Sequence, residues 1–397
     1  MKATKRIIIS CLILIMTSMG AAYSQPSDPF DSLEISLLTC EPHQAVYSLY
    51  GHTAIRIHDL RDGRDFVVNY GVFNMDAPYF ILRFAFGLTD YEMGVMPFDA
   101  FCKEYQHYGS GVIQQDLRLT SPEKANIMHA LQVNALPENV VYRYNYFYDN
   151  CTTRARDIIV DNMLRHVNYP AKSDSVATFR SMVHQYNSAH PWSRFGIDLL
   201  LGMKSDVNTT PIQRQFLPNN LRIDFDHATV ADSDGSTRPL VVRSFYVVSP
   251  GLQVVESEFP LRPSQCAWLL LIITLIVTLA EIFMKKHFWL YDIILMLATG
   301  LSGIIIFAML FSEQPTVSSN LQILLLNPLP LFFIYPLIRR IRNRQPYGWW
   351  KIWAAMLFLF FAGSLLQHYA EGMLIVGLAL LVRCLIRIAI PSPSRIG

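Results

Sequence analysis

Five long apolar stretches in the last third of the sequence set the main constraint on how this chain can fold. Each is close in length to the ~20 residues that a helix needs to cross the hydrocarbon core of a bilayer. They cover residues 266–284, 288–311, 321–338, 350–367 and 373–390. The composition agrees, because 52% hydrophobic and 16% charged residues are too apolar for an ordinary soluble protein. The sequence predicts an all-α bundle of five transmembrane helices over residues 266–390, with a cytoplasmic tail at 391–397.

The basic residues indicate which ends of these spans face the cytoplasm. Lys and Arg follow the first, third and fifth spans, whereas the loops at 312–320 and 367–372 contain neither. By the positive-inside rule the basic loops are cytoplasmic, so the residues ahead of the first span lie outside. In a Gram-negative-type cell this places a multi-pass protein in the inner membrane, with its large N-terminal part in the periplasm.

The N-terminus has the features of a secretory signal. Three basic residues precede an apolar run at 7–16, and small residues at Ala22 and Ser24 suit cleavage before Gln25. We therefore expect a signal peptide at 1–24; the alternative is an uncleaved anchor, although the run is short for a span. A periplasmic domain at 25–250 and a Pro-containing linker at 251–265 would follow.

Polar residues interrupt the predicted spans. Asn327-Pro328 must break the hydrogen-bond ladder of the third span, and such breaks survive where they face protein or a cavity. Glu281, Asp292 and Arg383 lie near cytoplasmic ends, where snorkelling to the headgroups is the usual explanation.

Cys151 is the candidate nucleophile. It follows Asp149-Asn150, residue types that cap helices, and precedes apolar residues at helical spacing. In the first turn of a helix, the free N–H groups and the helix dipole favour a thiolate over a thiol. The alternative is a small buried core residue, the usual role of a lone cysteine.

His52 and Asn69 are the candidate partners of this cysteine. His52 begins a strand of a predicted hairpin, and Asn69 lies on the second arm. The thiolate would attack an acyl carbon, His52 would move the proton, and Asn69 would orient the imidazole. Alternatively, His52 is structural and Asn69 serves only the sheet edge.

The remaining motifs are less specific. Residues 76–107 read as helical and aromatic, and part of this stretch could dip into the lipid surface or shape an acyl pocket. Residues 191–202 suggest a lid over a hydrophobic groove. Arg154 and Asp157 could bind a headgroup or pair with each other. Of six cysteines, Cys40 and Cys102 could form a disulfide that leaves Cys151 free, but the spacing does not establish it.

Other classes of site find no support in the sequence. There is no His/Cys metal spacing and no Gly-rich phosphate loop, so we predict no metal and no cofactor. The net charge of +2 and the lack of a basic stripe give no reason to expect nucleic acid.

Two short blocks carry a family resemblance. Tyr50-Gly51-His52-Thr53-Ala54 and Asn150-Cys151-Thr152 resemble the circularly permuted NlpC/P60 group, which is papain-like and includes lecithin–retinol acyltransferase. A wider set, followed by five spans, resembles the Bacteroides-type lipoprotein N-acyltransferases with an Lnb N-terminal periplasmic domain. These blocks are Tyr50–Ile57, Asn69–Phe73, Phe86–Met93, Tyr148–Asp157 and Phe195–Gly202.

The resemblance implies an α+β, permuted papain-like periplasmic domain joined to five transmembrane helices. It also implies transfer of a fatty acyl chain from a membrane phospholipid to the α-amino group of a diacylated lipoprotein's N-terminal cysteine. Cys151 would carry the chain as a thioester, and its backbone N–H, with Tyr50, would hold the oxyanion. The alternatives are a membrane-anchored cysteine amidase or peptidase acting on peptidoglycan, with an open polar groove, and a scaffold in which His52 and Cys151 lie far apart.

Overall fold

The computed structural model describes most of the chain and divides it into two compact units. The described residues are 28, 30–43, 48–73, 78–170, 177–231, 235–253, 259–342 and 347–389. The expected signal peptide and the tail at 391–397 lie outside them. The first unit contains residues 1–78, 89–175 and 210–255, and the second contains 79–88, 176–209 and 256–397. The second unit thus includes 79–88 and 176–209, two stretches that we expected in the periplasmic domain.

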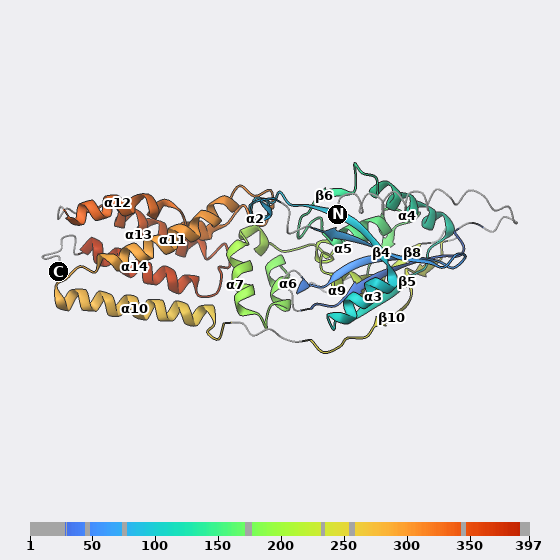
Figure 1. Ribbon diagram of the computed structural model, residues 1–397, viewed down its shortest axis with the longest axis horizontal. Helices are drawn as coiled ribbons and strands as arrows, with labels where there is room; N and C mark the ends of the chain where they lie inside the picture. The colour runs from blue at the N-terminus through green and yellow to red at the C-terminus, as the bar shows by residue number, and fades with distance from the viewer. Residues whose placement is uncertain are drawn as a thin grey trace. The chain divides into compact units, whose positions relative to one another are not determined.

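A seven-stranded antiparallel sheet organises the first unit (Figure 1). In spatial order its strands are β10 (Val241–Val248), β5 (Val112–Leu117), β1 (Leu33–Cys40), β2 (His52–Asp59), β3 (Arg64–Val72), β4 (Asp90–Pro97) and β6 (Val141–Arg143). A small second sheet is formed by β7 (Val167–Asn168), β8 (Thr229–Ala231) and β9 (Thr237–Pro239). The hairpin predicted around His52 is confirmed as β2 and β3, which pair antiparallel.

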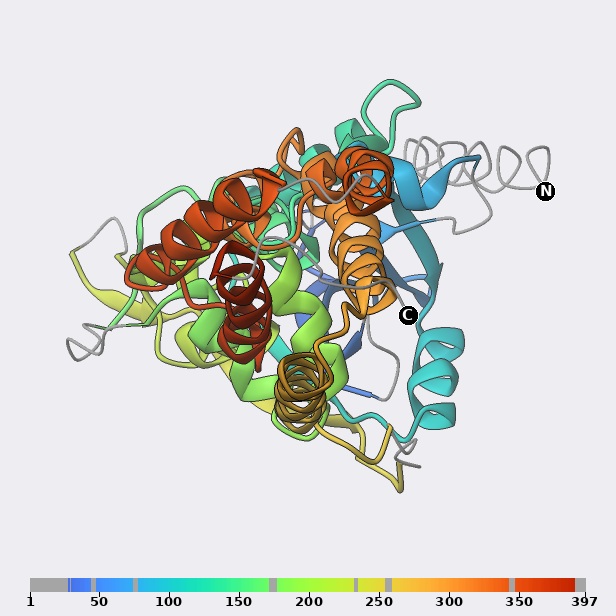
Figure 2. The same ribbon diagram turned by 90° about the vertical axis from the view of Figure 1, so that its left-hand side faces the viewer.

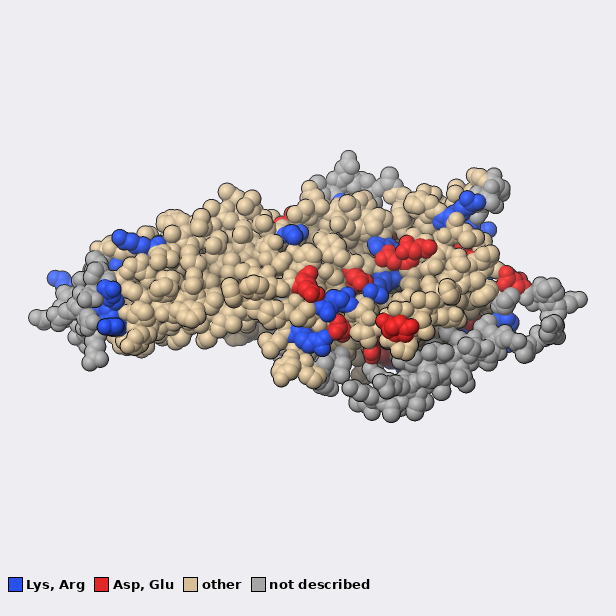
Figure 3. Space-filling view, turned by 90° about the horizontal axis from the view of Figure 1, so that it is seen from above, with Lys and Arg blue, Asp and Glu red and all other residues tan. Residues whose placement is uncertain are grey.

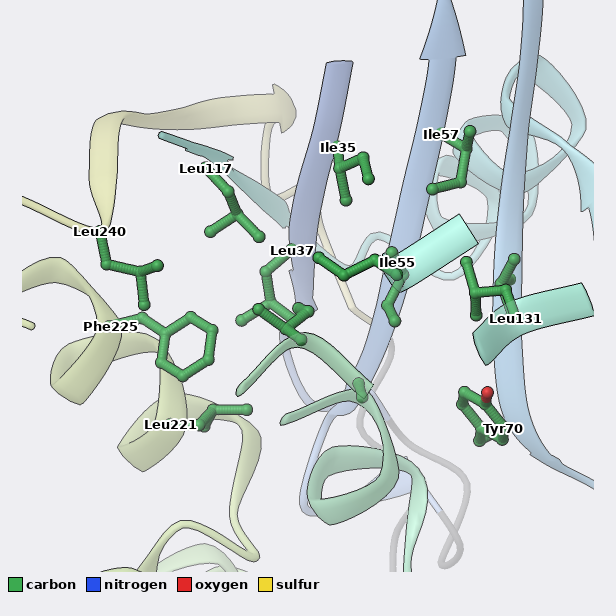
Figure 4. Packing of buried hydrophobic residues seen from close by; sticks show 14 of the residues in the cluster. Ile35, Leu37, Ile55, Ile57, Tyr70, Leu117, Leu131, Leu221, Phe225 and Leu240 are labelled. Atoms are coloured by element: carbon green, nitrogen blue, oxygen red, sulfur yellow. The ribbon is translucent and has the colours of Figure 1, made fainter. Parts of the chain in front are cut away.

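Helices cover both faces of the large sheet. The helices of this unit are α3 (Phe98–His107), α4 (Ser121–Asn134), α5 (Cys151–Val160), α8 (Pro211–Arg214) and α9 (Pro218–Asp226). On one face Leu37 and Ile55 pack with Leu221 and Phe225 of α9, in a cluster that also includes residues of α4 and α5 (Figure 4). On the other face Phe101 of α3 packs against a smaller cluster of strand residues. Strand β1, in which every residue except Glu34 is buried, lies inside this arrangement.

The expected helix over 76–107 is wrong in its middle. Residues 90–97 form strand β4, which pairs with β3, between the helices α2 (Phe80–Ala85) and α3. Tyr91 and Met93 are buried on the side of the main core, so the apolar residues here alternate as in a strand. An aromatic run without clear periodicity is compatible with both kinds of element, and pairing with β3 decides between them.

The second unit holds the apolar helices. Its elements are α2, α6 (Phe179–Tyr186), α7 (Pro191–Leu200), the 3₁₀ helix η2 (Met203–Asp206), α10 (Pro263–Met284), α11 (Trp289–Met309), η3 (Leu321–Leu324), α12 (Leu329–Arg342), α13 (Trp349–Gly363) and α14 (Met373–Ala389). Figure 2 looks along the C-terminal helices, where α14 packs against both α10 and α13. On the face in Figure 3 they form a belt without charged side chains, with Lys and Arg at its left end.

Among the described residues, three helical segments are long and apolar enough to cross a membrane. They are Pro263–Met284, Trp289–Met309 and Leu321–Ile341, whereas Trp349–Gly363 is a shorter apolar helix. The third includes η3 and the break before α12, at the place that Asn327-Pro328 predicted. Backbone atoms of Asn327 lie so close to Gly303 of α11 that any Cβ there would collide with them. The break is therefore packed against protein, as a break at this depth must be.

The charged residues that we expected near cytoplasmic ends are buried, so the snorkelling explanation is wrong. Arg383 contacts Glu281 at 2.8 Å and Asp292 at 2.7 Å, and Arg387 contacts the same two carboxylates at 2.6 and 2.8 Å. All four residues are at most 7% exposed. Two negative and two positive charges thus compensate one another between α10, α11 and α14, in a place where an unpaired charge would be costly.

Helix α7 is fixed to the ends of the membrane helices by buried amides. The side chains of Asn320, Gln322 and Gln367 each donate to a carbonyl at the end of α7 or just after it; these are the carbonyls of Leu199 (2.6 Å), Asp198 (2.8 Å) and Leu201 (3.0 Å). A lid over 191–202 would have to break these bonds and leave buried polar groups unpaired. The segment is therefore a fixed part of the second unit.

Candidate active site

The β2–β3 hairpin positions His52 and Asn69. Gly51 turns the chain into β2 with a φ of +78°, and a Cβ there would collide with the carbonyl of Cys40, so only glycine fits without strain. His52 is the first residue of β2, and its Nε2 lies 3.0 Å from Oδ1 of Asn69. An amide oxygen can only accept, so Nε2 carries the proton and Nδ1 is the ring nitrogen left for another partner.

A bulge in β3 brings the hairpin close to the cysteine. The β3–β4 register shifts between Asn69 and Val72, and Gly71 lies in the shifted part with a φ of +85°. A Cβ on Gly71 would be 3.4 Å from the Tyr144 ring and 3.7 Å from Cβ of Cys151. Bulges commonly re-aim side chains beside active sites, and this one lies two residues from Asn69.

Cys151 is the first residue of α5, as the sequence predicts. Asn150 is the N-cap, and its Oδ1 accepts from the backbone N–H of Thr152 and Thr153, both at 2.9 Å. The hydroxyl of Thr152 lies 3.0 Å from that of Thr53, the neighbour of His52 on β2. The cap and the Thr–Thr contact together hold the start of α5 against the strand that carries His52.

The thiol and the imidazole shift each other's pKa in opposite directions. Burial alone would raise the pKa of Cys151, but the charge and hydrogen bond of His52, with the Thr53 N–H, lower it below its usual value. Burial alone would lower the pKa of His52, but the charge of Cys151 and the bonds to Cys151 and Asn69 raise it. Both shifts favour a thiolate–imidazolium pair, the reactive form of a Cys–His nucleophile.

Tyrosines surround the nucleophile, and Tyr144 is the one that sequence reasoning missed. Burial is the main cause of its strongly raised pKa, and a hydrogen bond from the Cys151 backbone N–H opposes this rise. Its ring stacks on Tyr91 at 4.2 Å between centroids. Tyr50, which we expected at the oxyanion, is buried with its ring edge-on to Tyr146 at 5.4 Å. The residue beside the Cys151 amide is Tyr144.

Arg154 and Asp157 do not pair with each other. Arg154 forms a two-pronged ion pair with Asp149, at 2.7 and 2.8 Å, and its guanidinium lies 3.4 Å from the centre of the Tyr142 ring. Asp157 contacts Arg156 at 2.7 Å, while burial raises the pKa of its carboxyl. Arg154 therefore has a local structural partner in the segment that leads to Cys151.

The other cysteines are free thiols in the described part of the chain. Cys40, Cys102, Cys151, Cys266 and Cys384 form no disulfide, so the pairing of Cys40 with Cys102 is not present. Among the described residues, no group of three or more His, Cys, Asp or Glu side chains could hold a metal ion.

Comparison with known families gives two matches along the chain. Residues 21–185 match the Lnb N-terminal periplasmic domain, and residues 254–392 match the Lnb transmembrane domain. The chain belongs to the Lnb family. It is a membrane protein with a periplasmic domain, and the periplasmic match contains His52, Asn69 and Cys151. No curated protein and no solved structure matches the chain.

Proposed function

We propose that this Lnb-family protein is a lipoprotein N-acyltransferase of the inner membrane. It moves a fatty acyl chain from a membrane phospholipid, through a thioester on Cys151, to the α-amino group of the N-terminal cysteine of a diacylated lipoprotein. The observation that carries this proposal is the Cys151–His52–Asn69 group, in which the strand that carries the histidine precedes the helix that carries the cysteine. We also propose that five helices, α10 to α14, span the membrane.

The first half-reaction acylates the enzyme. The Cys151 thiolate attacks the ester carbonyl of the phospholipid, and the new C–S bond forms as the carbonyl electrons move onto oxygen. When this intermediate collapses, the C–O bond to glycerol breaks and imidazolium of His52 gives its proton to the leaving oxygen. The products are a thioester and a lysophospholipid. Asn69 accepts a hydrogen bond from Nε2 of His52, and this bond leaves Nδ1 facing the reacting atoms.

The second half-reaction transfers the chain to the lipoprotein. The free α-amine attacks the thioester carbonyl, and His52, now neutral, takes a proton from the amine. Collapse breaks the C–S bond and restores the thiolate–imidazolium pair, with an amide as the product. Cys151 is 9% exposed and set among tyrosines, surroundings that limit hydrolysis of the thioester by water.

The same features bear on the competing functions. A scaffold requires no interaction between His52 and Cys151, but the two side chains shift each other's pKa directly. A peptidoglycan hydrolase favours an open polar groove, whereas the surroundings of Cys151 are aromatic and buried. The buried aromatic site favours an acyl chain as substrate.

Tyr144 is expected to contribute to the oxyanion site. Its hydroxyl accepts from the Cys151 N–H and has its own hydrogen to donate, so the hydroxyl suits a developing oxyanion. Tyr144→Phe should lower kcat by about 10²-fold, the order found when one oxyanion donor is lost. Tyr50→Phe is the matched control, and kcat measured for both variants in proteoliposomes separates them. Equal effects of the two substitutions would remove Tyr144 from this role.

The decisive test of the proposed function is mass spectrometry of a reporter lipoprotein. Cells would express the intact protein, Cys151→Ala or His52→Ala, and Cys102→Ala as a matched control thiol of the same unit. We expect a third acyl chain on the N-terminal cysteine, with lysophospholipid, only for the intact protein and the Cys102 variant. Unchanged acylation in the Cys151 variant would show that this thiol is not the nucleophile, and peptidoglycan fragments would then be assayed.

A further inference from the structure

Residues 79–88, which lie between β3 and β4 in the sequence, expose several large apolar side chains. Tyr79 is 77% exposed and Leu82 is 58% exposed, and Phe84 and Leu88 are also exposed. Arg83 is the sole charged residue in the stretch 79–88, and its Nε donates to the carbonyl of Leu88 at 3.2 Å. The charge is thus held against the backbone of the segment. Four large apolar side chains within ten residues form a patch of the kind that contacts another apolar phase.

The backbone holds Tyr79 in a conformation that is uncommon for such a residue. Its φ is 58°, in the left-handed region that a non-glycine side chain enters only at an energetic cost. The residue lies at the N-cap of α2, directly ahead of the apolar helix. The backbone conformation of this turn therefore holds the Tyr79 ring in its exposed position.

The segment is attached to the end of a membrane span. The backbone N–H of Glu313 donates to the carbonyl of Phe86 at 3.0 Å, just beyond the end of α11 (Figure 1). At Gly87, with a φ of +69°, a Cβ would be 2.9 Å from Oγ of Ser312 and 3.0 Å from Cγ of Gln314. Glycine thus permits a close fit between this turn and residues 312–314. The exposed rings of Phe307 and Phe311 lie on the same end of α11, at 5.3 Å between centroids.

We propose that residues 79–88 insert into the outer leaflet and contact the acyl chains of its phospholipids. The end of a span such as α11 lies at the boundary between headgroups and acyl chains, where aromatic residues are enriched. The backbone bond to Glu313 fixes α2 at that level, and its exposed side chains supply the apolar contact that interfacial segments bury in lipid. The occupant of this patch is lipid, because the patch continues the exposed apolar surface of a membrane span.

Insertion of residues 79–88 would also affect the reaction, and this effect rests on the proposed function. In chain order, α2 is the next described element after β3, the strand that carries Asn69. An inserted α2 would loosen the lipid packing of the outer leaflet, which a donor phospholipid must leave in order to react. Removing its apolar side chains should therefore slow transfer from a bilayer donor more than transfer from a soluble one.

The insertion itself is tested without reference to activity. The fluorescent amino acid Anap would replace Leu82 or, as a control, Leu60, which is similarly exposed on the β2–β3 turn of the first unit. The full-length protein would be placed in phosphatidylcholine nanodiscs with and without doxyl-labelled acyl chains. We expect quenching of at least twofold at position 82 and none at position 60. Equal fluorescence at position 82 in both kinds of nanodisc would overturn the proposal.

A second experiment separates the membrane contact from the chemistry. Leu82→Asp with Phe84→Asp would be compared with Leu60→Asp, using long-chain phosphatidylcholine in vesicles and monomeric dihexanoylphosphatidylcholine as donors. We expect at least a tenfold loss with the vesicle donor and less than a twofold loss with the monomeric donor. Equal losses on both donors would overturn the role of α2 in donor supply. If the unsubstituted protein transferred from neither donor, the proposed function would fall while the quenching result still decided the insertion.

Discussion

Replacing His52 with alanine is expected to lower kcat/KM for acyl transfer by about 10²–10⁴-fold, the range found for a positioned acid–base group. The reason lies in the two opposed effects on Cys151. Burial raises the pKa of its thiol, and the charge and hydrogen bond of His52, together with the hydrogen bonds of Thr53 and Thr152, more than offset that rise. In the His52→Ala variant burial is the largest effect that remains, so the pKa of the Cys151 thiol should lie above its usual value.

The pH dependence of thiol alkylation tests this expectation independently of any substrate. In the intact protein, the alkylation rate should rise with pH through a midpoint below the usual thiol pKa, because the thiolate reacts and the thiol does not. In the His52→Ala variant the same midpoint should move to higher pH. Cys151→Ala supplies the background from the other four thiols described. Identical midpoints in the intact protein and the His52 variant would contradict the thiolate–imidazolium pair.

The rate of acyl transfer should follow a bell-shaped pH profile for the same reason. The ascending limb reports formation of the thiolate, whose pKa is lowered, and the descending limb reports loss of the imidazolium proton, whose pKa is raised. The two groups interact strongly, so the limbs belong to the pair and not to either residue alone. The bond from Asn69 contributes to the raised pKa of His52, and its loss in Asn69→Ala should move the descending limb to lower pH.

Local sequence determines the parts of the site that could be predicted. The caps of α5 are encoded by residues next to Cys151, and the start of β2 by Gly51 and the alternation that follows it. Asn69 was found because antiparallel pairing puts the second arm of a hairpin beside the first. Each of these inferences involves residues close together in the chain, or joined by one short turn.

The features that escaped prediction depend on distant parts of the chain. Tyr144 lies next to the Cys151 amide with its ring beside Gly71 of the β3 bulge, a placement that sequence patterns do not reveal. Composition alone predicts helix for the residues of β4, whereas pairing with β3 makes them a strand. The attachment of residues 79–88 to the end of α11 joins segments more than 220 residues apart, beyond the reach of any local pattern.

The charges between α10, α11 and α14 illustrate the same limit and give the second large expected effect. From sequence, Glu281, Asp292 and Arg383 looked like separate residues near the cytoplasmic surface. In the fold Arg383 is 1% exposed and donates to both carboxylates, at 2.7 to 3.2 Å. Removing its charge leaves two buried carboxylates with Arg387 as their remaining guanidinium partner. Breaking a buried pair in this way costs about 3–5 kcal/mol, far more than the net value of an exposed pair.

We therefore expect Arg383→Met to lower the Tm of the purified protein in detergent by on the order of 10 °C. Arg340→Met is the matched control, because Arg340 is exposed on α12 and should change stability by less than about 0.5 kcal/mol. The double variant Arg383→Met with Asp292→Leu removes one charge of each sign and leaves Arg387 paired with Glu281 at 2.6 Å. The Tm of the double variant should fall by less than the Tm of Arg383→Met alone, because the uncompensated charge, and not the missing bond, is the main cost. Additive losses in the double variant would show instead that each residue stabilises the helices through its own packing.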